Sequence, residues 1–440
     1  MSGLATGWVS IHPLQHTWRL HLTGKKTPRA LRTQKKISLQ FGAWKKTLLI
    51  TKRRPDPKLI RAKVRIRKQK NRFAIGPFIG ILTVAGGGLF RGVQSNFIDI
   101  IEAGRKWGAF VYVVPIENIN WKSHTVQGYV FHAKEKKWIK ELLPLPHVLY
   151  NRIPNRAYEE KEHVKAALEQ LGTLRDVRLY NPQFFNKQKL YAILQKDAEV
   201  TSYLPQTLPL TSKTVLYDML NLHPFVYVKP VQGMAGQGIY RIQKQRDGGF
   251  LLQYQQRNKT ISKQFTARED IWKYLSPRIV QPYLVQQGID LATFENKLFD
   301  IRLLAQKNGC GIWDVTGTGI RLAGSGKITT HVPWGGSVQA PEDILLAAFP
   351  HTSQETLLAS IHRMALNIAR SLEKEWPTLG EVSMDIGIDK NARIWFIEAN
   401  AKPGKFDEPH IRKLSLRRIV EYAQHQANFI ESGEPRHAHP

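Results

Sequence analysis

The chain has 440 residues, an apolar content of 42% and a formal net charge of +30. This length favours two or three domains over one core. No apolar run reaches the 18 residues that indicate a membrane span, and Trp8, His12 and Pro13 interrupt the region where a signal peptide needs an apolar core. Cys310 is the single cysteine, which excludes an internal disulfide and a zinc site built from cysteines. We therefore expect a cytoplasmic protein.

The positive charge is concentrated at the amino terminus. Residues 1–72 contain 20 Lys and Arg against one acid, Asp56, and so carry +19 of the net charge. Alternation in Lys63–Arg67 places basic side chains on one face of a strand. The β-prone pieces of this segment are Trp18–Leu22, Ile37–Phe41, Thr47–Ile50 and Val64–Ile66. We predict a small basic β module that binds nucleic acid, an anionic polymer or an anionic lipid surface by charge. The alternatives are a solubilising basic face and a disordered arm.

Residues 73–182 have the pattern of an α/β unit. The predicted strands are Ile79–Val84, Ala109–Val114, Gly128–Phe131 and His147–Tyr150, and the predicted helices are Phe97–Trp107 and Tyr158–Leu171. This βαβ alternation predicts a parallel sheet. Gly86–Gly88 lacks the Gly-x-Gly-x-x-Gly spacing of a dinucleotide loop and is interpreted as a tight turn.

A glycine-rich loop follows the strand Phe225–Pro230, which contains Lys229. The loop Gly233-Met-Ala-Gly-Gln-Gly238 leads to a returning strand at Ile239–Ile242. An amine beside backbone without side chains suits phosphate, because N–H groups can approach the oxygens. An ordinary glycine-rich hairpin would give the same pattern, and the loop is not a Walker A motif. Predicted helices precede it at Lys187–Leu194 and Thr211–Leu220.

A second hairpin is predicted near the carboxyl terminus, with strands at Val382–Ile388 and Arg393–Ile397. In that pairing Asp385 faces Glu398, and Asn400 lies two residues on along the same face. Two carboxylates and an amide oxygen suit Mg²⁺ or Mn²⁺. The alternative is a surface hairpin whose acidic residues are merely solvated.

The order Asp385…Glu398-Ala-Asn400-Ala-Lys-Pro-Gly404 resembles the metal-binding end of the ATP-grasp ligases. The carboxyl-terminal third resembles the YheC/YheD branch of that superfamily, whose members are associated with the spore coat. Upstream, Asp300-Ile-Arg302 is similar to the family's Asp-x-Arg strand, and Thr329–Ser337 is similar to its loop over the transferring phosphate. The resemblance covers roughly residues 75–425.

The resemblance implies a role for individual residues. Lys187, with Lys189 as an alternative, would support the α-phosphate, while Lys229 and the loop containing Gly233, Gly236 and Gly238 would contact the phosphates. The adenine hinge would contain Gln286, Gln287 and Ile289, with Gln281–Leu284 as a second register. Glutamines stand where many relatives have Glu. Arg302 and Arg321 would act as catalytic residues, and Asp385, Glu398 and Asn400 as metal ligands. Asn151-Arg152 and Asn155-Arg156 would either bind an anionic acceptor or form a solvated loop.

The implied fold is a mixed α/β and α+β chain with four parts. A basic β module at 1–72 and a parallel-sheet α/β domain at 73–182 precede an ATP-grasp domain at 183–425 and a polar tail at 426–440. The resemblance implies an ATP-dependent, Mg²⁺-requiring ligase that joins a carboxylate to an amine through an acylphosphate. Spore association and a homo-oligomer are further expectations from the family. The alternative is a nucleotide-binding or structural spore-coat protein without turnover.

Overall fold

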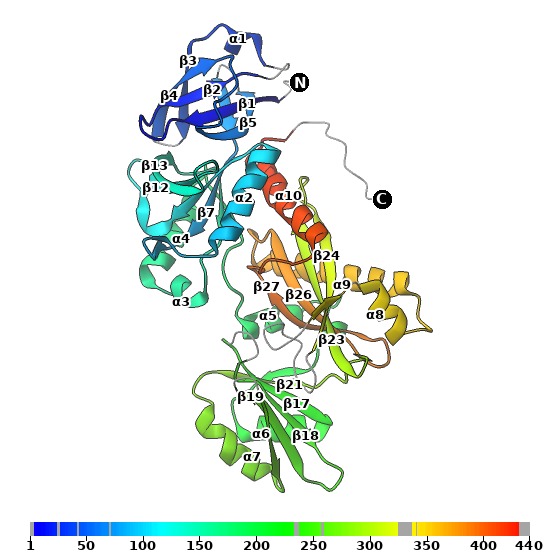
Figure 1. Cartoon of the computed structure of the whole chain (residues 1–440). Helices are drawn as coiled ribbons and strands as arrows, with labels where there is room; N and C mark the ends of the chain where they lie inside the picture. Colours follow the sequence, from blue (N-terminus) through cyan, green and yellow to red (C-terminus); the bar gives the residue numbers. More distant parts are fainter. Residues whose placement is uncertain are drawn as a thin grey trace.

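The computed structural model of the chain describes residues 4–23, 27–41, 44–69, 72–232, 237–256, 259–323, 337–339 and 341–430. Four sheets of five or more strands follow one another along the sequence. Figure 1 shows the first sheet at one end of an elongated molecule and the third sheet at the other end. Among the described residues, no helix combines the length and the apolar character that crossing a membrane requires.

The first sheet confirms the predicted β structure of the amino-terminal segment. Its strand order is β3-β4-β2-β1-β5-β6. The elements are β1 (Ala5–Ile11), β2 (Trp18–His21), α1 (Arg29–Arg32), β3 (Lys36–Phe41), β4 (Trp44–Thr51), β5 (Ile60–Gln69) and β6 (Arg72–Gly76). On β5 the apolar residues Ala62, Val64 and Ile66 are buried, while the basic residues between them are half-buried, as the alternation predicted. Trp18 is 2% exposed, with its ring 5.6 Å from that of Trp44, which gives this basic segment an aromatic core.

The second sheet contains four parallel strands in the order β10-β7-β14-β15, and β12 adds to β10 in the antiparallel sense. Its strands are β7 (Phe78–Thr83), β10 (Phe110–Pro115), β11 (Ile119–Asn120), β12 (Thr125–His132), β13 (Lys137–Pro144), β14 (Val148–Asn151) and β15 (Arg178–Tyr180). Its helices are α2 (Gln94–Trp107), α3 (Arg156–Glu159) and α4 (Glu162–Thr173). The predicted single helix Tyr158–Leu171 is wrong, because Lys161 adopts extended backbone and separates α3 from α4.

Gly86–Gly88 forms the turn between the short strands β8 (Ala85–Gly86) and β9 (Leu89–Phe90). All three glycines have positive φ, at 135°, 65° and 84°. Residues with a Cβ rarely adopt this backbone. The interpretation of this run as a tight turn is confirmed.

The third sheet is antiparallel, in the order β16-β21-β17-β18-β19-β20. Its strands are β16 (Thr207–Pro209), β17 (Phe225–Pro230), β18 (Tyr240–Lys244), β19 (Phe250–Gln256), β20 (Lys259–Phe265) and β21 (Tyr283–Gln287). The helices of this region are α5 (Lys187–Leu194), α6 (Lys213–Leu222) and α7 (Arg268–Leu275). The sequence predicted the bounds of α5 correctly. Asn186 caps this helix by accepting a hydrogen bond from the Lys189 N–H.

The fourth sheet has the order β25-β24-β23-β26-β27, with β22 added to β23. Its strands are β22 (Thr293–Phe294), β23 (Lys297–Lys307), β24 (Trp313–Leu322), β25 (Ser337–Gln339), β26 (Glu381–Ile388) and β27 (Ile394–Asn400). Its helices are α8 (Pro341–Ala348), α9 (Gln354–Glu375) and α10 (Pro409–Gln426). Short 3₁₀ turns occur at Ile116–Asn118, Thr201–Tyr203 and Ser276–Arg278. Helix α10 packs against both the fourth sheet and α2 (Figure 1). The division of the chain into four parts stays a prediction.

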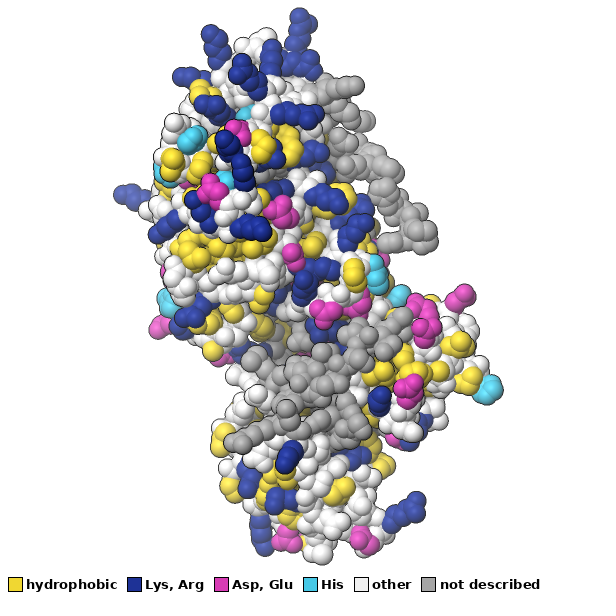
Figure 2. All heavy atoms as spheres, viewed as in Figure 1, with side chains coloured by type: hydrophobic (Ala, Val, Ile, Leu, Met, Phe, Trp, Pro, Cys, Tyr) yellow, Lys and Arg dark blue, Asp and Glu magenta, His cyan; other side chains and the backbone are white. Residues whose placement is uncertain are grey.

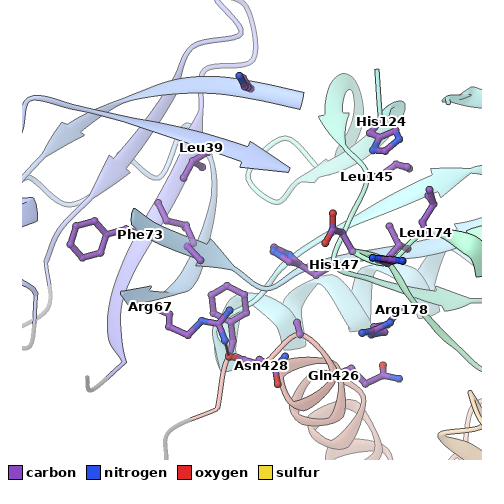
Figure 3. Close-up of a pocket in the computed structure, with 18 of the residues that line it drawn as sticks. Leu39, Arg67, Phe73, His124, Leu145, His147, Leu174, Arg178, Gln426 and Asn428 are labelled. Atoms are coloured by element: carbon purple, nitrogen blue, oxygen red, sulfur yellow. Dashed lines mark hydrogen bonds between the residues drawn. The ribbon is translucent and has the colours of Figure 1, made fainter. Parts of the chain in front are cut away.

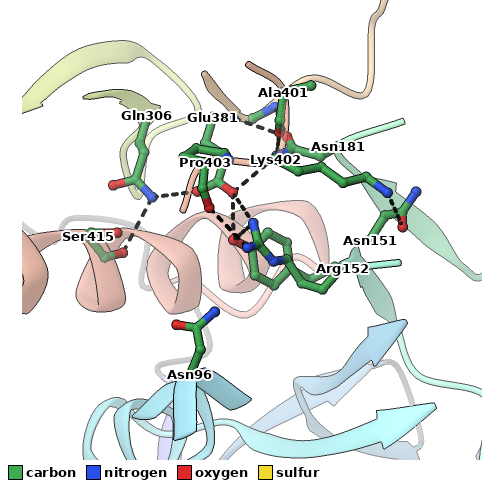
Figure 4. Close-up of polar contacts among 12 residues, drawn as sticks. Asn96, Asn151, Arg152, Asn181, Gln306, Glu381, Ala401, Lys402, Pro403 and Ser415 are labelled. Carbon is green, nitrogen blue, oxygen red and sulfur yellow. Dashed lines mark hydrogen bonds and ion pairs between the residues drawn. The ribbon is translucent and has the colours of Figure 1, made fainter. Parts of the chain in front are cut away.

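A buried polar network joins the fourth sheet to the second (Figure 4). Glu381, the first residue of β26, is 2% exposed and accepts a hydrogen bond from the Tyr150 hydroxyl at 2.5 Å. It also accepts from Asn181 Nδ2 at 3.2 Å and Gln306 Nε2 at 2.9 Å, and Arg152 lies 3.6 Å away. Burial raises the pKa of Glu381, and the Arg152 charge and the hydrogen-bond donors oppose that shift. The carboxylate is therefore held by donors on three strand or loop segments.

The segment after β27 is fastened to the same part of the second sheet. Asn181 donates a hydrogen bond to the Ala401 carbonyl at 2.6 Å, and Arg152 donates to the Pro403 carbonyl at 2.9 Å. Lys402 pairs with Glu159 and donates to Asn151 Oδ1 at 2.8 Å. Asn151 and Arg152 thus bind protein groups in this structure, and Asn155 caps α3. The interpretation of this segment as a solvated loop is wrong.

We expect Glu381→Ala to lower the free energy of unfolding by about 3–5 kcal/mol, because it leaves Arg152 and three donors without their buried partner. Glu381→Gln should cost less, since one amide oxygen still accepts. Urea denaturation of both variants measures the effect. Glu375→Ala is the matched control, because Glu375 forms a surface pair with Lys189 that is worth about 1 kcal/mol or less. An equal loss in Glu381→Ala and Glu375→Ala would contradict the expectation.

Candidate functional site

The hairpin of β26 and β27 forms with the predicted register. Asp385 is directly opposite Glu398, and Ser383 is opposite Asn400, so Asp385, Glu398 and Asn400 share one face. A bulge follows this pair, because Ile386 is opposite Phe396 and Ile397 is left over. Asp385 is 7% exposed, Glu398 is half-buried and Asn400 is exposed. The exposure of these side chains therefore increases along the face, from Asp385 in the sheet interior to Asn400 at the surface.

Arg321 and Asp300 complete the buried side of this face. Arg321 is 4% exposed and binds Asp300 through two hydrogen bonds, Nε to Oδ1 at 2.8 Å and an NH2 nitrogen to Oδ2 at 2.6 Å. The same NH2 nitrogen lies 2.9 Å from Asp385 Oδ2. Burial opposes the charge of Arg321, but the carboxylates of Asp385 and Asp300 outweigh it and raise its pKa. Arg321 is thus engaged by two carboxylates, one of them a predicted metal ligand.

Arg302 lies on the same face and has fewer partners. Its Cα neighbours across the sheet are Asp385 on β26 and Gly319 on β24. Its guanidinium carbon is 5.0 Å from the centre of the Phe406 ring. Its buried Nε has no hydrogen-bond partner among the described residues. An arginine with an unpaired buried donor beside two carboxylates suits an anion that accepts hydrogen bonds.

Two lysines approach Glu398 from other elements. Lys187, the first residue of α5, lies 3.0 Å from Glu398 Oε2. Lys229 on β17 is 5% exposed and donates to Gln286 Oε1 at 2.7 Å. Burial lowers the pKa of Lys229 to about 7; the Lys187 charge adds to this effect and Glu398 opposes it. The predicted phosphate lysines and the predicted metal ligands therefore lie in one electrostatic neighbourhood. Lys189, the alternative to Lys187, instead pairs with Glu375 at 2.5 Å.

Gln286 connects Lys229 to the fourth sheet. Its amide nitrogen donates to the Tyr191 hydroxyl and to the Thr207 hydroxyl, each at 2.7 Å. Both hydroxyls already donate elsewhere, Tyr191 to the Ile397 carbonyl and Thr207 to the Pro205 carbonyl. They can therefore only accept from residue 286, and a glutamate there could not supply the two donors. This arrangement explains why an amide suits the position where the family resemblance led us to expect Glu.

The structure gives fewer contacts for the other residues that were predicted to bind the nucleotide. Gln287 is half-buried and accepts a hydrogen bond from the Gln206 N–H at 3.1 Å. Ile289 is half-buried in the connection between β21 and β22. Gly238 has a φ of +72°, which favours glycine. Gly233, Gly236 and the predicted loop 329–336 lie outside the described residues.

Sequence reasoning did not select Tyr191, Thr207 and Asp300 as site residues. Tyr191 is four residues after Lys187, so both lie on one face of α5, and this spacing was a usable signal. Asp300 is two residues before Arg302 on β23 and therefore shares its face. Thr207 offered no signal, because its role depends on the contact between β16 and β21.

The donor set fits a divalent cation with a nucleotide. Asp385, Glu398 and Asn400 offer oxygen ligands, while Lys187 and Arg302 offer positive charge for phosphates. Lys229 offers an amine, and a phosphate beside it would favour its protonated form. Within the described part of the chain, no cluster of three or more His, Cys, Asp or Glu side chains could hold a metal by itself. A metal at this hairpin would thus take ligands from Asn400 and from the nucleotide as well.

Comparison with known proteins identifies the family to which this fold belongs. A family model described as YheC/D-like ATP-grasp matches residues 176–425, which is more than half of the chain. The chain therefore belongs to the YheC/D-like ATP-grasp family, and the predicted ATP-grasp fold is confirmed.

Two curated relatives come from Bacillus subtilis strain 168. Endospore coat-associated protein YheD is 29% identical over 367 residues, which cover 80% of this chain and 79% of that protein. Endospore coat-associated protein YheC is 23% identical over 283 residues, covering 64% of this chain and 77% of that protein. A solved structure, D-alanyl-alanine synthetase A from Vibrio cholerae O1, is 13% identical with a TM-score of 0.47; the match covers 80% of this chain and 98% of that one.

The lowered pKa of Lys229 predicts a pH dependence of stability. Between pH 7 and about 10.5, the unfolded state holds a proton on this amine that the folded state has lost, so the free energy of unfolding rises with pH. The contribution reaches about 5 kcal/mol at most. We expect urea denaturation at pH 7, 8 and 9 to give a smaller increase for Lys229→Met than for the unmodified chain.

Lys244→Met is the matched control for this measurement. Lys244 is an exposed lysine on β18 of the same sheet, so its replacement should leave the increase between pH 7 and 9 intact. Equal slopes for Lys229→Met and Lys244→Met would show that Lys229 titrates normally.

Proposed function

We propose that the protein is a ligase that uses ATP with Mg²⁺ or Mn²⁺ to join a carboxylate to an amine. The supporting observation is the pairing of Asp385 with Glu398 on β26 and β27, with Lys187 from α5 bound to Glu398. Membership of the ATP-grasp family supports the use of ATP. In this proposal the carboxylate substrate is phosphorylated by ATP to an acylphosphate, and the amine displaces the phosphate.

Each side chain has a stated task in the proposal. Asp385, Glu398 and Asn400 would hold the metal, which when bound offsets the charge of the phosphate oxygens. Lys187 and Lys229 would position the phosphates, together with the loop that contains Gly233, Gly236 and Gly238. Gln286, Gln287 and Ile289 would border the base. Positioning and electrostatics carry most of a phosphoryl transfer, so a separate nucleophile in the protein is not needed.

The arginines would act on the transferred group. Arg302 is the better placed of the two, because its Nε is unpaired among the described residues and its side chain is half-buried. Arg321 already binds Asp300 and Asp385, so in this proposal it fixes Asp385 and offsets its charge until a metal binds. Both would stabilise the phosphoryl group or the acylphosphate by charge.

The first test is ATP binding. We expect calorimetry with Mg²⁺ to show binding that Lys229→Ala and Glu398→Ala each weaken by about tenfold or more, since a hydrogen bond to a charged group is worth about 1.5–3 kcal/mol. Removal of the metal with EDTA should weaken binding in the unmodified chain. Lys244→Ala, an exposed lysine of the same sheet, serves as the control. Absence of binding at millimolar ATP would refute the nucleotide site.

The second test separates a ligase from a binding protein. We expect ADP release only when a mixture of amino acids or short peptides is added, and we expect Arg302→Met to reduce its rate by about 10²-fold or more while ATP binding stays intact. Release measured by a coupled enzyme assay gives this rate. Binding without acceptor-dependent release would favour the second candidate function, a nucleotide-binding component of the spore coat. The names of YheD and YheC, both endospore coat-associated proteins, motivate that candidate and a spore location for this chain.

A further inference from the structure

A cavity of about 850 Å³ lies between the first and second sheets. Figure 3 shows Leu39 from the first sheet on one side of this cavity, His147 (just before β14) and Arg178 of β15 on the other side, and Asn428 from the segment after α10 below them. The volume falls within the range of about 300–1,000 Å³ that is usual for ligand sites. None of the residues assigned to ATP or metal lines it.

Three sheet edges border this cavity. Strands β3 and β6 are the two ends of the first sheet, and β15 is one end of the second. The cavity is lined by Ser38 and Leu39 of β3, by Phe73–Ile75 of β6 and by Arg178 of β15. Within the described part of the chain, none of these three strands has a ladder partner on its outer side. Strands β3 and β6 contact each other, so β15 offers the more open of the three edges. Outer edges carry backbone N–H and C=O groups that can pair with an added strand.

Positive charge surrounds the same cavity. Lys45, Arg67, Arg175 and Arg178 line it, against a single acidic residue, Asp176. Lys45, Arg175 and Arg178 are exposed, and none of them forms an ion pair with another described residue. Net positive charge without internal partners attracts an anionic ligand and hastens its binding.

Arg67 shows how one cation is presented to the cavity. It donates to the Asn428 carbonyl at 2.7 Å and lies 5.2 Å from the centre of the Phe429 ring. Its Nε is buried and has no hydrogen-bond partner among the described residues. A buried, unpaired donor in a native protein calls for a partner, which a ligand carboxylate would supply.

The lining also contains apolar side chains, beside polar ones such as His124, His147 and Gln426. Leu39, Leu145 and Phe429 are buried, and Phe73 and Leu174 are half-buried. Single-stranded nucleic acid is held by aromatic rings that are open to base stacking. Both aromatic side chains are at least partly covered, so the lining favours a peptide with alternating acidic and apolar side chains over a nucleic acid.

We propose that this cavity binds an extended acidic peptide segment of a partner protein, which adds as a strand to the outer edge of β15. The backbone of the peptide would pair with β15, and its carboxylates would meet Lys45, Arg67, Arg175 and Arg178. In this proposal the amino-terminal sheet contributes two of the four cations, Lys45 and Arg67. The site is separate from the proposed ligase chemistry and does not depend on it.

The probe for the test is a fluorescein-labelled decapeptide of alternating Glu and Val, followed by fluorescence anisotropy with the full chain. We expect saturable binding that weakens at least tenfold in the double variant Arg175→Glu/Arg178→Glu. Both residues are exposed, so the fold should tolerate the change, which thermal denaturation checks. Lys196→Glu/Lys244→Glu, which reverses two exposed lysines elsewhere, should bind as the unmodified chain does.

Two further probes separate strand addition from general attraction of anions. The same peptide with N-methylated amides at alternate residues keeps its charge but loses backbone donors, so we expect binding at least tenfold weaker. A decathymidine oligonucleotide should bind more weakly than the Glu-Val peptide. Equal binding of the N-methylated peptide, tighter binding of the oligonucleotide or no effect of the Arg175→Glu/Arg178→Glu change would each overturn the proposal. A dimer that excludes the peptide would overturn it too, by assigning the β15 edge to self-association.

Discussion

The hairpin of β26 and β27 depends on buried hydrogen bonds at its open end, where β26 begins and β27 finishes. Glu381 at the start of β26 is held by Tyr150, Asn181 and Gln306, while Asn181 accepts from the Glu381 N–H at 3.1 Å. After β27, Lys402 reaches Glu159 and Asn151 in the second sheet region. Buried polar groups carry a high penalty when they lose a partner. The positions of the Asp385 and Glu398 carboxylates therefore depend on contacts made outside the site.

Much of the fold could be predicted from the sequence, because its signals are local. Alternation and a turn specified the hairpin and the register that places Asp385 opposite Glu398. The bounds of α5 followed from the apolar spacing after Asn186. Strands β1, β6, β13, β19 and β20 were missed. For β1 and β6 the reason is local, since Gly7 interrupts the first and the second ends in Gly76-Pro77, and both features usually weaken a strand assignment.

The contacts that define the site were harder to predict. Gln286 meets Tyr191 and Thr207, which are 95 and 79 residues away in sequence, so only the packed fold brings these side chains together. Arg321 was expected to face the transferred group, whereas the structure gives it two carboxylates, Asp300 and Asp385. The spacing along a strand predicts which residues share a face. It does not predict which of the charged groups on that face a long side chain will pair with.

The hydrogen bonds between the hairpin and the second sheet also restrict how these parts can move relative to each other. Because the second and fourth sheets share the Glu381 network and the packing of α10 on α2, they should move as one rigid body. The hydrogen bonds between the third sheet and this body include those that Gln286 donates to Tyr191 and that Gln195 donates to the Thr207 carbonyl. Opening and closing around a nucleotide would then be a rotation of the third sheet relative to the second and fourth sheets. The chain segments that flank it, before β16 and after β21, would act as the hinges.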